Sequence, residues 1–315
     1  MNYMYLYLPV ALTSINILIP VGLGLAVGLL SGLFGVGGGF LMTPLLIMFG
    51  IPSTVAAATD SNQIVAASTS GTYAHWKVGN VDFKMGLYLL IGGFVGGLAG
   101  VQAIKILKAT GNADFVIKMT YVLMLGIVGT YMLIESLQSM KKAKNKEVGA
   151  NGRSPVQSQE SGFTKFLKSL PLQTHFEKSG VTHSLLLPVI FGGFVGILAA
   201  IMGVGGGFLM VPVMVYILRM PMHVVVGTSL FQILFNCIEV TFLQAYTNHN
   251  VDFILAVLLL VGSTVGAQVG AVFGRKLKGE QLKIILALIV LVVTAKIVLE
   301  LTLTPSLLIS QAGGH

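Results

Sequence analysis

The residues best suited to chemistry lie within long apolar runs of this sequence. Gln232, Asn236 and Glu239 are spaced i, i+4 and i+7, so a helix would place them on one face. Ionisable groups inside a membrane-spanning segment are costly and usually face a cavity or a partner. Glu239 could therefore be a proton-coupling site, or a gate whose charge repels an anion until it is neutralised. The alternative is a protonated, hydrogen-bonded packing residue.

The sequence GVGGGFLM occurs twice, at residues 35–42 and 203–210, and a proline follows each copy. Its glycine run would present backbone N–H groups, free of side chains, at the start of a short helix. Such groups lack intrahelical partners and the helix dipole adds partial positive charge, so the arrangement favours an anion. Two copies meeting near the membrane midplane could bind one small oxyanion. Alternatively, the glycines could allow close helix packing.

Polar residues open the apolar element that follows each glycine motif. In the first copy, Asp60 could titrate, or it could simply cap its helix. The candidate proton-coupling or gating residues are therefore Glu239 and Asp60. The candidate substrate-binding residues from both copies are Gly37, Gly38, Gly39, Thr59, Asn62, Gln63, Gly205, Gly206, Gly207, Thr228, Ser229, Gln232 and Asn236.

The sequence lacks the patterns of an enzyme or a metalloprotein. One cysteine, Cys237, cannot build a disulfide framework or a cysteine metal cluster. A Ser-His-Asp arrangement, HExxH and a Walker motif are all missing, and the histidines lie near the ends of apolar runs or between the two copies. We therefore predict no cofactor, no metal site and no enzymatic activity.

The composition indicates the class of protein. Of the 315 residues, 55% are apolar and only 10% are charged, whereas soluble proteins carry about 25% charged residues. Several windows reach the roughly 20 apolar residues that cross a bilayer as a helix. The sequence therefore predicts a multi-pass protein of the cell inner (plasma) membrane. Its net charge of +8 fits basic cytoplasmic loops and does not indicate nucleic-acid binding.

The chain contains an internal duplication. Besides the glycine motif, Pro20 matches Pro188, and NVDF occurs at both Asn80 and Asn250 with nearly constant spacing. Each copy contains five apolar elements, of which the second is too short for a full straight span. The elements are expected near residues 16–35, 38–50, 54–75, 84–105 and 115–138 in the first copy, and near 185–202, 206–219, 223–246, 252–274 and 281–302 in the second.

These elements predict an all-α polytopic fold with about eight to ten transmembrane segments. It comprises a first transmembrane repeat at residues 1–138, a basic linker at 139–184 and a second repeat at 185–315. The excess of lysine and arginine predicts a cytoplasmic linker. An odd number of crossings per repeat would invert the second repeat relative to the first, a plan that recurs in secondary transporters.

The repeated motifs resemble those of a known family. GLFGVGGGFLMTPLLIMFGIP with the following AAATDSNQ, and MGVGGGFLMVPVMV with GTSLFQ, are similar to the TauE/SafE permeases, also called the four-toluene-sulfonate uptake permease family. The likeness runs from Ile15 to Leu301, apart from the linker. It implies ion-coupled transport of small sulfur-containing anions such as sulfite, sulfoacetate and other organosulfonates.

Together these features predict a secondary transporter that exports a sulfur-containing anion across the lipid bilayer. A negative-inside potential would expel an anion, at about 2.3 kcal/mol per charge per 100 mV. A coupling proton or sodium ion and a homodimer are compatible with the sequence. The alternatives are a permease or channel for another small anion, or a non-transporting membrane scaffold subunit.

Overall fold

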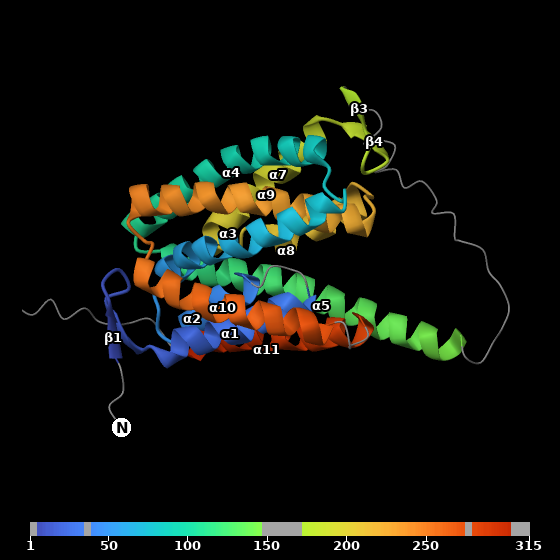
Figure 1. Cartoon of the computed structure of the whole chain (residues 1–315). Helices are drawn as coiled ribbons and strands as arrows, with labels where there is room; N and C mark the ends of the chain where they lie inside the picture. Colours follow the sequence, from blue (N-terminus) through green and yellow to red (C-terminus); the bar gives the residue numbers. More distant parts are fainter. Residues whose placement is uncertain (1–4, 35–38, 147–171, 275–278, 304–315) are drawn as a thin grey trace, which may run out of the picture.

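The computed structural model describes residues 5–34, 39–146, 172–274 and 279–303, and these fold mainly into helices (Figure 1). The first half contains β1 (Tyr5–Leu8), β2 (Thr13–Asn16), α1 (Leu18–Phe34), α2 (Gly39–Met48), α3 (Ser53–Lys77), α4 (Phe83–Ala109) and α5 (Ala113–Lys146). The second contains β3 (Gln173–Phe176), β4 (Val181–Ser184), α7 (Leu186–Met202), α8 (Gly207–Pro212) with the π-helical η1 (Val213–Ile217), α9 (Met222–Leu243) with the π-helical η2 (Gln244–Asn248), α10 (Phe253–Gly274) and α11 (Gly279–Leu303). The predicted all-α fold is confirmed, and every predicted apolar element corresponds to a helix.

Each half also begins with a short β-hairpin, which the apolar pattern did not predict. The strands pair antiparallel, with Tyr5 opposite Asn16 in the first hairpin and Gln173 opposite Ser184 in the second. The second hairpin lies in residues that the sequence analysis assigned to the linker, and α5 also extends into that region as far as Lys146. Residues 147–171 of the expected linker lie outside the described residues.

Several helices have the length and composition to cross a membrane. Within the described residues, the long apolar segments are Phe83–Ala109, Ala113–Tyr131, Met222–Asn248 and Phe253–Gly270. The second element of the first half is short, as predicted: α2 has 10 residues and rises about 15 Å, half of a hydrocarbon core of about 30 Å. A helix of this length cannot cross the hydrocarbon core alone, so other helices must shield its ends from lipid.

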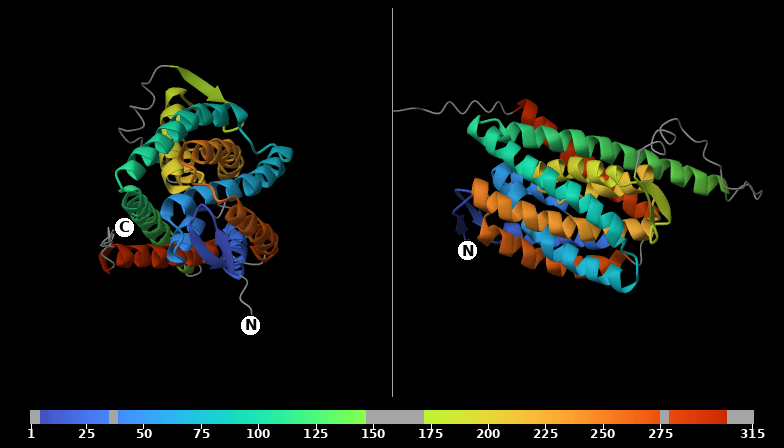
Figure 2. Two further views of the ribbon diagram at one scale, coloured as in Figure 1. Left: turned by 90° about the vertical axis from the view of Figure 1, so that its left-hand side faces the viewer. Right: turned by 90° about the horizontal axis from the view of Figure 1, so that it is seen from above.

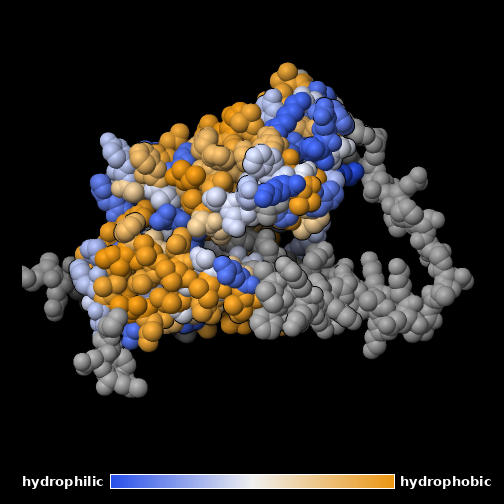
Figure 3. Space-filling model, in the orientation of Figure 1, coloured by the Kyte–Doolittle hydropathy of each residue, from blue (hydrophilic) through white to orange (hydrophobic). Residues whose placement is uncertain are grey.

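Apolar ridges on the outer helices face away from the bundle. On α10, valines recur at every fourth residue and are between 40% and 53% exposed; they are Val257, Val261, Val265 and Val269. Apolar side chains cover this region of the surface in Figure 3, while hydrophilic ones gather over the β3–β4 hairpin. Because the i, i+4 spacing aligns side chains along a helix, these ridges form a surface suited to lipid.

Glycines let two pairs of helices pack backbone against backbone. Gly96 of α4 abuts the carbonyl of Gly193 in α7, and Gly266 of α10 abuts the carbonyl of Leu25 in α1. A side chain at Gly24 would begin 2.6 Å from the carbonyl oxygen of Leu259. The hydrophobic effect does not drive helix association inside lipid, so helices depend on the close van der Waals packing that small residues allow. These glycines lie outside the duplicated motif and serve close helix packing.

Each main helix contact joins one helix of the first half to one helix of the second, and equivalent helices make equivalent contacts. The main helix pairs are α1 with α10, α4 with α7, α3 with α9 and α5 with α11. The equivalent residues Phe40 and Phe208 stack on one another, with ring centroids 4.6 Å apart and planes at 12°. These contacts are the ones expected if a pseudo-two-fold axis relates the two repeats near this aromatic pair and the α3–α9 contact, and that relation stays a prediction.

The two halves also point in opposite directions within the bundle. Along the α3–α9 contact, Ile64 lies beside Gly205 and Ile233, whereas Gly71 lies beside Leu230, so the two helices run antiparallel. The equivalent hairpins β1–β2 and β3–β4 lie at opposite ends of the bundle (Figures 1 and 2). This arrangement is the one expected of inverted repeats; their orientation across a membrane stays a prediction.

Two buried aspartates tie each half to the other. Asp82 Oδ1 accepts a hydrogen bond from the backbone N–H of Met85 at 3.0 Å and so caps the start of α4. Its Oδ2 accepts from the backbone N–H of Ser179, in the second hairpin, at 3.1 Å. The N–H of Asp82 itself donates to Thr228 Oγ1 of α9 at 3.0 Å. Through its carboxylate and its backbone N–H, this one aspartate thus joins three elements from both repeats.

Asp252 repeats this arrangement with the halves exchanged. Its Oδ1 caps α10 through the N–H of Leu255, and its Oδ2 accepts from the N–H of Val10 in the first hairpin, both at 3.1 Å. The N–H of Asp252 donates to Thr59 Oγ1 of α3 at 3.1 Å. Each hairpin is therefore anchored to the opposite repeat, which explains how a two-stranded hairpin keeps its shape here.

We expect Asp82→Ala to lower the thermal stability of the detergent-solubilised protein. The change removes a helix cap and leaves the buried N–H of Ser179 without its acceptor, which together cost about 2 kcal/mol or more. Heating followed by size-exclusion chromatography measures the loss. The control Glu177→Ala replaces an exposed acid in the hairpin that Asp82 holds and should change stability by no more than about 0.5 kcal/mol. Equal melting temperatures for the two variants would contradict this role of Asp82.

Candidate functional site

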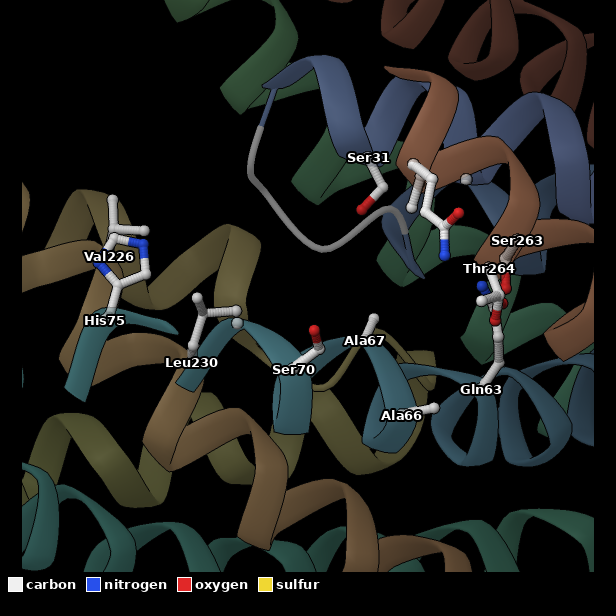
Figure 4. Close-up of a pocket in the computed structure, with 14 residues that line it drawn as sticks. Ser31, Gln63, Ala66, Ala67, Ser70, His75, Val226, Leu230, Ser263 and Thr264 are labelled. Atoms are coloured by element: carbon white, nitrogen blue, oxygen red, sulfur yellow. The ribbon is translucent and has the colours of Figure 1, made fainter. Parts of the chain in front are cut away.

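A pocket of about 470 Å³ lies among α1, α3, α9 and α10 (Figure 4). It extends along α3 from Gln63 to His75, close to the end of that helix at Lys77. Ser31 of α1 and Ser70 of α3 point into the same space from opposite sides. The polar residues that line the pocket are Ser31, Gln63, Ser70, His75, Ser263, Thr264 and Gln268.

The pocket explains why a central helix is so polar. α3 packs against α2, α9 and α10, yet Ala66, Ala67 and Ser70 on its pocket face are exposed. Polar side chains inside a membrane protein persist where they line a water-filled cavity. The pocket therefore has the character of an aqueous cavity that enters the bundle beside α3.

The lining offers hydrogen bonds rather than fixed charge. Hydroxyl and amide groups make up most of the polar side chains in the lining, and among the lining residues only His75 is ionisable. Gln63 Oε1 and His75 Nδ1 are buried and have no hydrogen-bond partner among the described residues. Buried polar atoms normally have partners, so these two atoms are available to water or a ligand. Hydroxyl and amide donors can bind a small oxyanion and release it again, because no salt bridge must be broken.

Two residues of the polar face predicted on α9 lie against glycines of α4 and do not line this pocket. Asn236 and Glu239 lie against Gly93 and Gly97: a side chain at Gly97 would begin 2.8 Å from Glu239 Oε2. Gln232 precedes them on the same face of α9 and is fully buried. We call these five residues the α4–α9 seam. Both polar atoms of Gln232 and of Asn236, and Glu239 Oε2, have no hydrogen-bond partner among the described residues.

Asp60 lies deep in the protein, about two turns into α3, and therefore does not cap that helix. Its Oδ2 accepts a hydrogen bond from Thr43 Oγ1 of α2 at 2.9 Å. Its Oδ1 is buried and has no partner among the described residues. The alternative interpretation of Asp60 as a helix cap is wrong, and its role in proton coupling or gating stays a prediction.

The described glycines of the duplicated motif pack beside apolar side chains. Gly205 and Gly206 have φ angles of +69° and +79°, which side chains rarely adopt. A side chain at Gly205 would begin 2.6 Å from Cys237 Sγ, and one at Gly206 would begin 2.7 Å from Val195 Cγ1. None of the described motif glycines, Gly39, Gly203, Gly205, Gly206 and Gly207, lines the pocket, and Gly37 and Gly38 lie outside the described residues. Anion binding by these motifs stays a prediction.

The remaining candidate residues divide between the pocket and the scaffold. Gln63 lines the pocket. Thr59 and Thr228 accept the hydrogen bonds of the aspartate ties, and Ser229 Oγ donates to the carbonyl of Val226 at 3.0 Å. Asn62 lies on α3 outside the pocket lining. Sequence reasoning did not include the other polar lining residues among the site candidates, although polar residues in otherwise apolar spans were the available signal; they are Ser31, Ser70, His75, Ser263, Thr264 and Gln268.

Comparison with known proteins identifies the family. The family model "Sulfite exporter TauE/SafE" matches residues 21–297. "Probable membrane transporter protein YunE" of Bacillus subtilis (strain 168) is 25% identical over 90% of this chain and 98% of its own length. "Probable membrane transporter protein YjnA" of the same organism is 27% identical over 88% and 97%.

A shorter match carries the family name itself. "Sulfite exporter TauE/SafE family protein 1" of Arabidopsis thaliana is 31% identical over 32% of this chain and 23% of its own length. No solved structure matches the chain significantly. The matched region includes every pocket-lining residue, and the fold has the apolar spans of a multi-pass protein. The chain therefore belongs to the TauE/SafE sulfite exporter family and is a membrane transporter.

Proposed function

We propose that this transporter exports a small sulfur-containing anion, such as sulfite, sulfoacetate or another organosulfonate. The observation that carries the proposal is a pocket whose lining contains seven polar side chains but no lysine or arginine, beside a central polar helix. The names of the family and of the Arabidopsis relative favour sulfite or a related anion. Hydroxyl and amide groups suit the oxygen atoms that these anions share.

The pseudo-two-fold arrangement supports transport by alternating access. The halves are proposed to lie inverted in the inner membrane, so that a similar polar path leads from each side towards the α3–α9 contact. The pocket extends to the end of α3 that lies beside the β3–β4 hairpin. At this end of the bundle, Lys84 of α4 donates a hydrogen bond to the carbonyl of His175 in the hairpin at 3.4 Å. With a cytoplasmic linker, this end faces the cytoplasm, and the pocket would load an anion from inside the cell.

Asp60 and Glu239 are the proposed coupling or gating acids. Both are carboxylic acids with an oxygen that lacks a hydrogen-bond partner among the described residues. Neither forms an ion pair with another described residue. A proton or a sodium ion could neutralise either acid while the anion passes, and the membrane potential would add about 2.3 kcal/mol per charge per 100 mV to export.

We expect reconstituted protein to move radiolabelled sulfoacetate into liposomes with saturable kinetics. Ala67→Leu should reduce this flux to the level of protein-free liposomes, because the longer side chain enters the pocket. Ala245→Leu is the matched control, since Ala245 is exposed on η2 and does not line the pocket. Saturable flux that survives Ala67→Leu would place the path elsewhere. Wild-type protein that moves neither sulfoacetate nor sulfite would contradict the proposed substrate class.

A further inference from the structure

The open pocket has a counterpart across the pseudo-two-fold axis. Pocket-lining positions on α3 correspond in the repeat to positions on α9; these pairs are Gln63 and Gln232, Ala67 and Asn236, and Ser70 and Glu239. Pocket-lining positions on α10 correspond to glycines of α4; these pairs are Ser263 and Gly93, and Ala267 and Gly97. The counterpart of the pocket is therefore the α4–α9 seam.

Side chains fill this counterpart. A side chain at Gly93 would begin 2.6 Å from Asn236 Nδ2, and one at Gly97 would begin 2.8 Å from Glu239 Oε2. The amide and the carboxyl group thus lie directly on the bare backbone of α4. Asn236 is only 1% exposed. The seam is closed where the pocket is open.

The sizes of the facing side chains explain why the pocket is open and the seam is closed. In the pocket, small side chains face one another: Ala67 and Ser70 on α3, Ser263 and Ala267 on α10. In the seam, the α9 side has long polar side chains and the α4 side has none. If only close packing were needed, apolar side chains would serve at lower cost, because a buried polar group without a partner costs about 1–3 kcal/mol. Five such unpartnered atoms lie in the seam.

We propose that the α4–α9 seam is the second half of the anion path, closed in this structure, and that Asn236 and Glu239 are its gate. This inference rests on the proposed function and adds the route. When α9 moves away from α4, the polar atoms of the seam would face water and the passing anion. The pocket would close in the same step, because α3 and α9 pack against one another.

The geometry places the two openings at opposite ends of the bundle. The pocket extends from Gln63 towards the C-terminal end of α3, and the seam extends from Gln232 towards the C-terminal end of α9. Since α3 and α9 run antiparallel, these directions are opposite. A membrane normal along the bundle therefore gives each path its own side of the membrane.

Single cysteines at equivalent positions test this route. The chain's only cysteine, Cys237, is first replaced by serine. Two matched pairs are then made, Ser70→Cys with Glu239→Cys and Ala67→Cys with Asn236→Cys. Each variant is labelled with a membrane-impermeant trimethylammonium thiosulfonate, in intact cells and in inside-out vesicles, with and without sulfoacetate. Size-exclusion chromatography of each variant excludes misfolding.

The α3 cysteines should be labelled rapidly from one side of the membrane only. Without sulfoacetate, the labelling rate of the α9 cysteines should be about one tenth of the α3 rate or lower, because a minor state is typically populated at about 10% or below. The α9 cysteines should react only from the opposite side of the membrane. Saturating sulfoacetate should raise the α9 rates and lower the α3 rates. Flux of sulfoacetate is measured separately on the Cys237→Ser background.

Labelling of both members of a pair from the same side would overturn the proposed route. So would α9 cysteines that stay unlabelled from either side in all conditions, since the seam would then be a packing interface. Either result could accompany normal sulfoacetate flux, in which case the proposed function stands and only the route fails. Opposite-sided labelling without sulfoacetate flux would support the route and reject the substrate class.

Discussion

Replacing Gly92 by leucine should prevent the helices of the transporter from packing into the folded protein. A side chain at this position of α4 would meet the backbone carbonyl of Val189 and begin 2.7 Å from the N–H of Gly193, both in α7. Backbone atoms cannot move aside as a flexible side chain can, so the helices would have to separate. Overpacking of a core costs about 1–3 kcal/mol even where side chains can adjust, while whole domains are stable by only about 5–15 kcal/mol.

A graded series tests the cause of this effect. Gly92→Ala should lower stability measurably, and Gly92→Leu should leave no monodisperse protein on size-exclusion chromatography. The control is Gly22→Ala in α1, where an added Cβ has no neighbour within 4 Å among the described residues. This control should be neutral or stabilise the protein by up to about 1 kcal/mol, because alanine has a higher helix propensity than glycine. Equal stability of Gly92→Ala and Gly22→Ala would show that the α4–α7 contact tolerates separation.

Glu239→Gln should remove most of the pH dependence of anion flux. Gly97 lies against Glu239, and the other seam residues, Gln232, Asn236 and Gly93, carry no charge. The proton of Glu239 therefore decides the charge of the seam. If the ionised carboxylate repels the anion, wild-type flux should rise as the pH falls, by up to about tenfold per pH unit above the titration midpoint. Glutamine keeps the shape and the hydrogen-bonding capacity but cannot ionise. The variant should therefore transport at a level close to the acidic limit of the wild type at every pH.

The measurement is sulfoacetate flux into proteoliposomes between about pH 5 and pH 9 without a membrane potential. Glu300→Gln is the control, because Glu300 is an acid near the end of α11, outside both the pocket and the seam. It should retain the wild-type profile. An unchanged profile for Glu239→Gln would mean that Glu239 is a packing residue and that any coupling resides elsewhere, with Asp60 as the next candidate.

The sequence by itself determined the helices, the duplication and the polar face of α9. Runs of apolar residues, glycines and prolines act within a few turns of chain, so they define helix boundaries without knowledge of the partner helices. The i, i+4, i+7 spacing of Gln232, Asn236 and Glu239 likewise depends only on helical geometry. These features were predicted correctly because their causes are local.

Only the tertiary structure decided which helices meet. The hairpins escaped prediction because each strand has four residues and is stabilised by the distant Asp252 or Asp82 rather than by its own pattern. Thr59 and Thr228 are equivalent polar residues, yet their hydroxyls accept backbone hydrogen bonds of the scaffold. A sequence cannot distinguish these roles, because the partner lies in the other repeat.

The pocket itself also required the tertiary structure. Ser263 and Gln268 on α10 became lining residues only because α10 packs beside α1 and α3, which lie far earlier in the chain. The difference between an open pocket and a closed seam likewise depends on side chains contributed by two helices at once, Ala67 with Ser263 on one side and Asn236 with Gly93 on the other. Space between helices is a property of pairs of faces, and the sequence specifies each face separately.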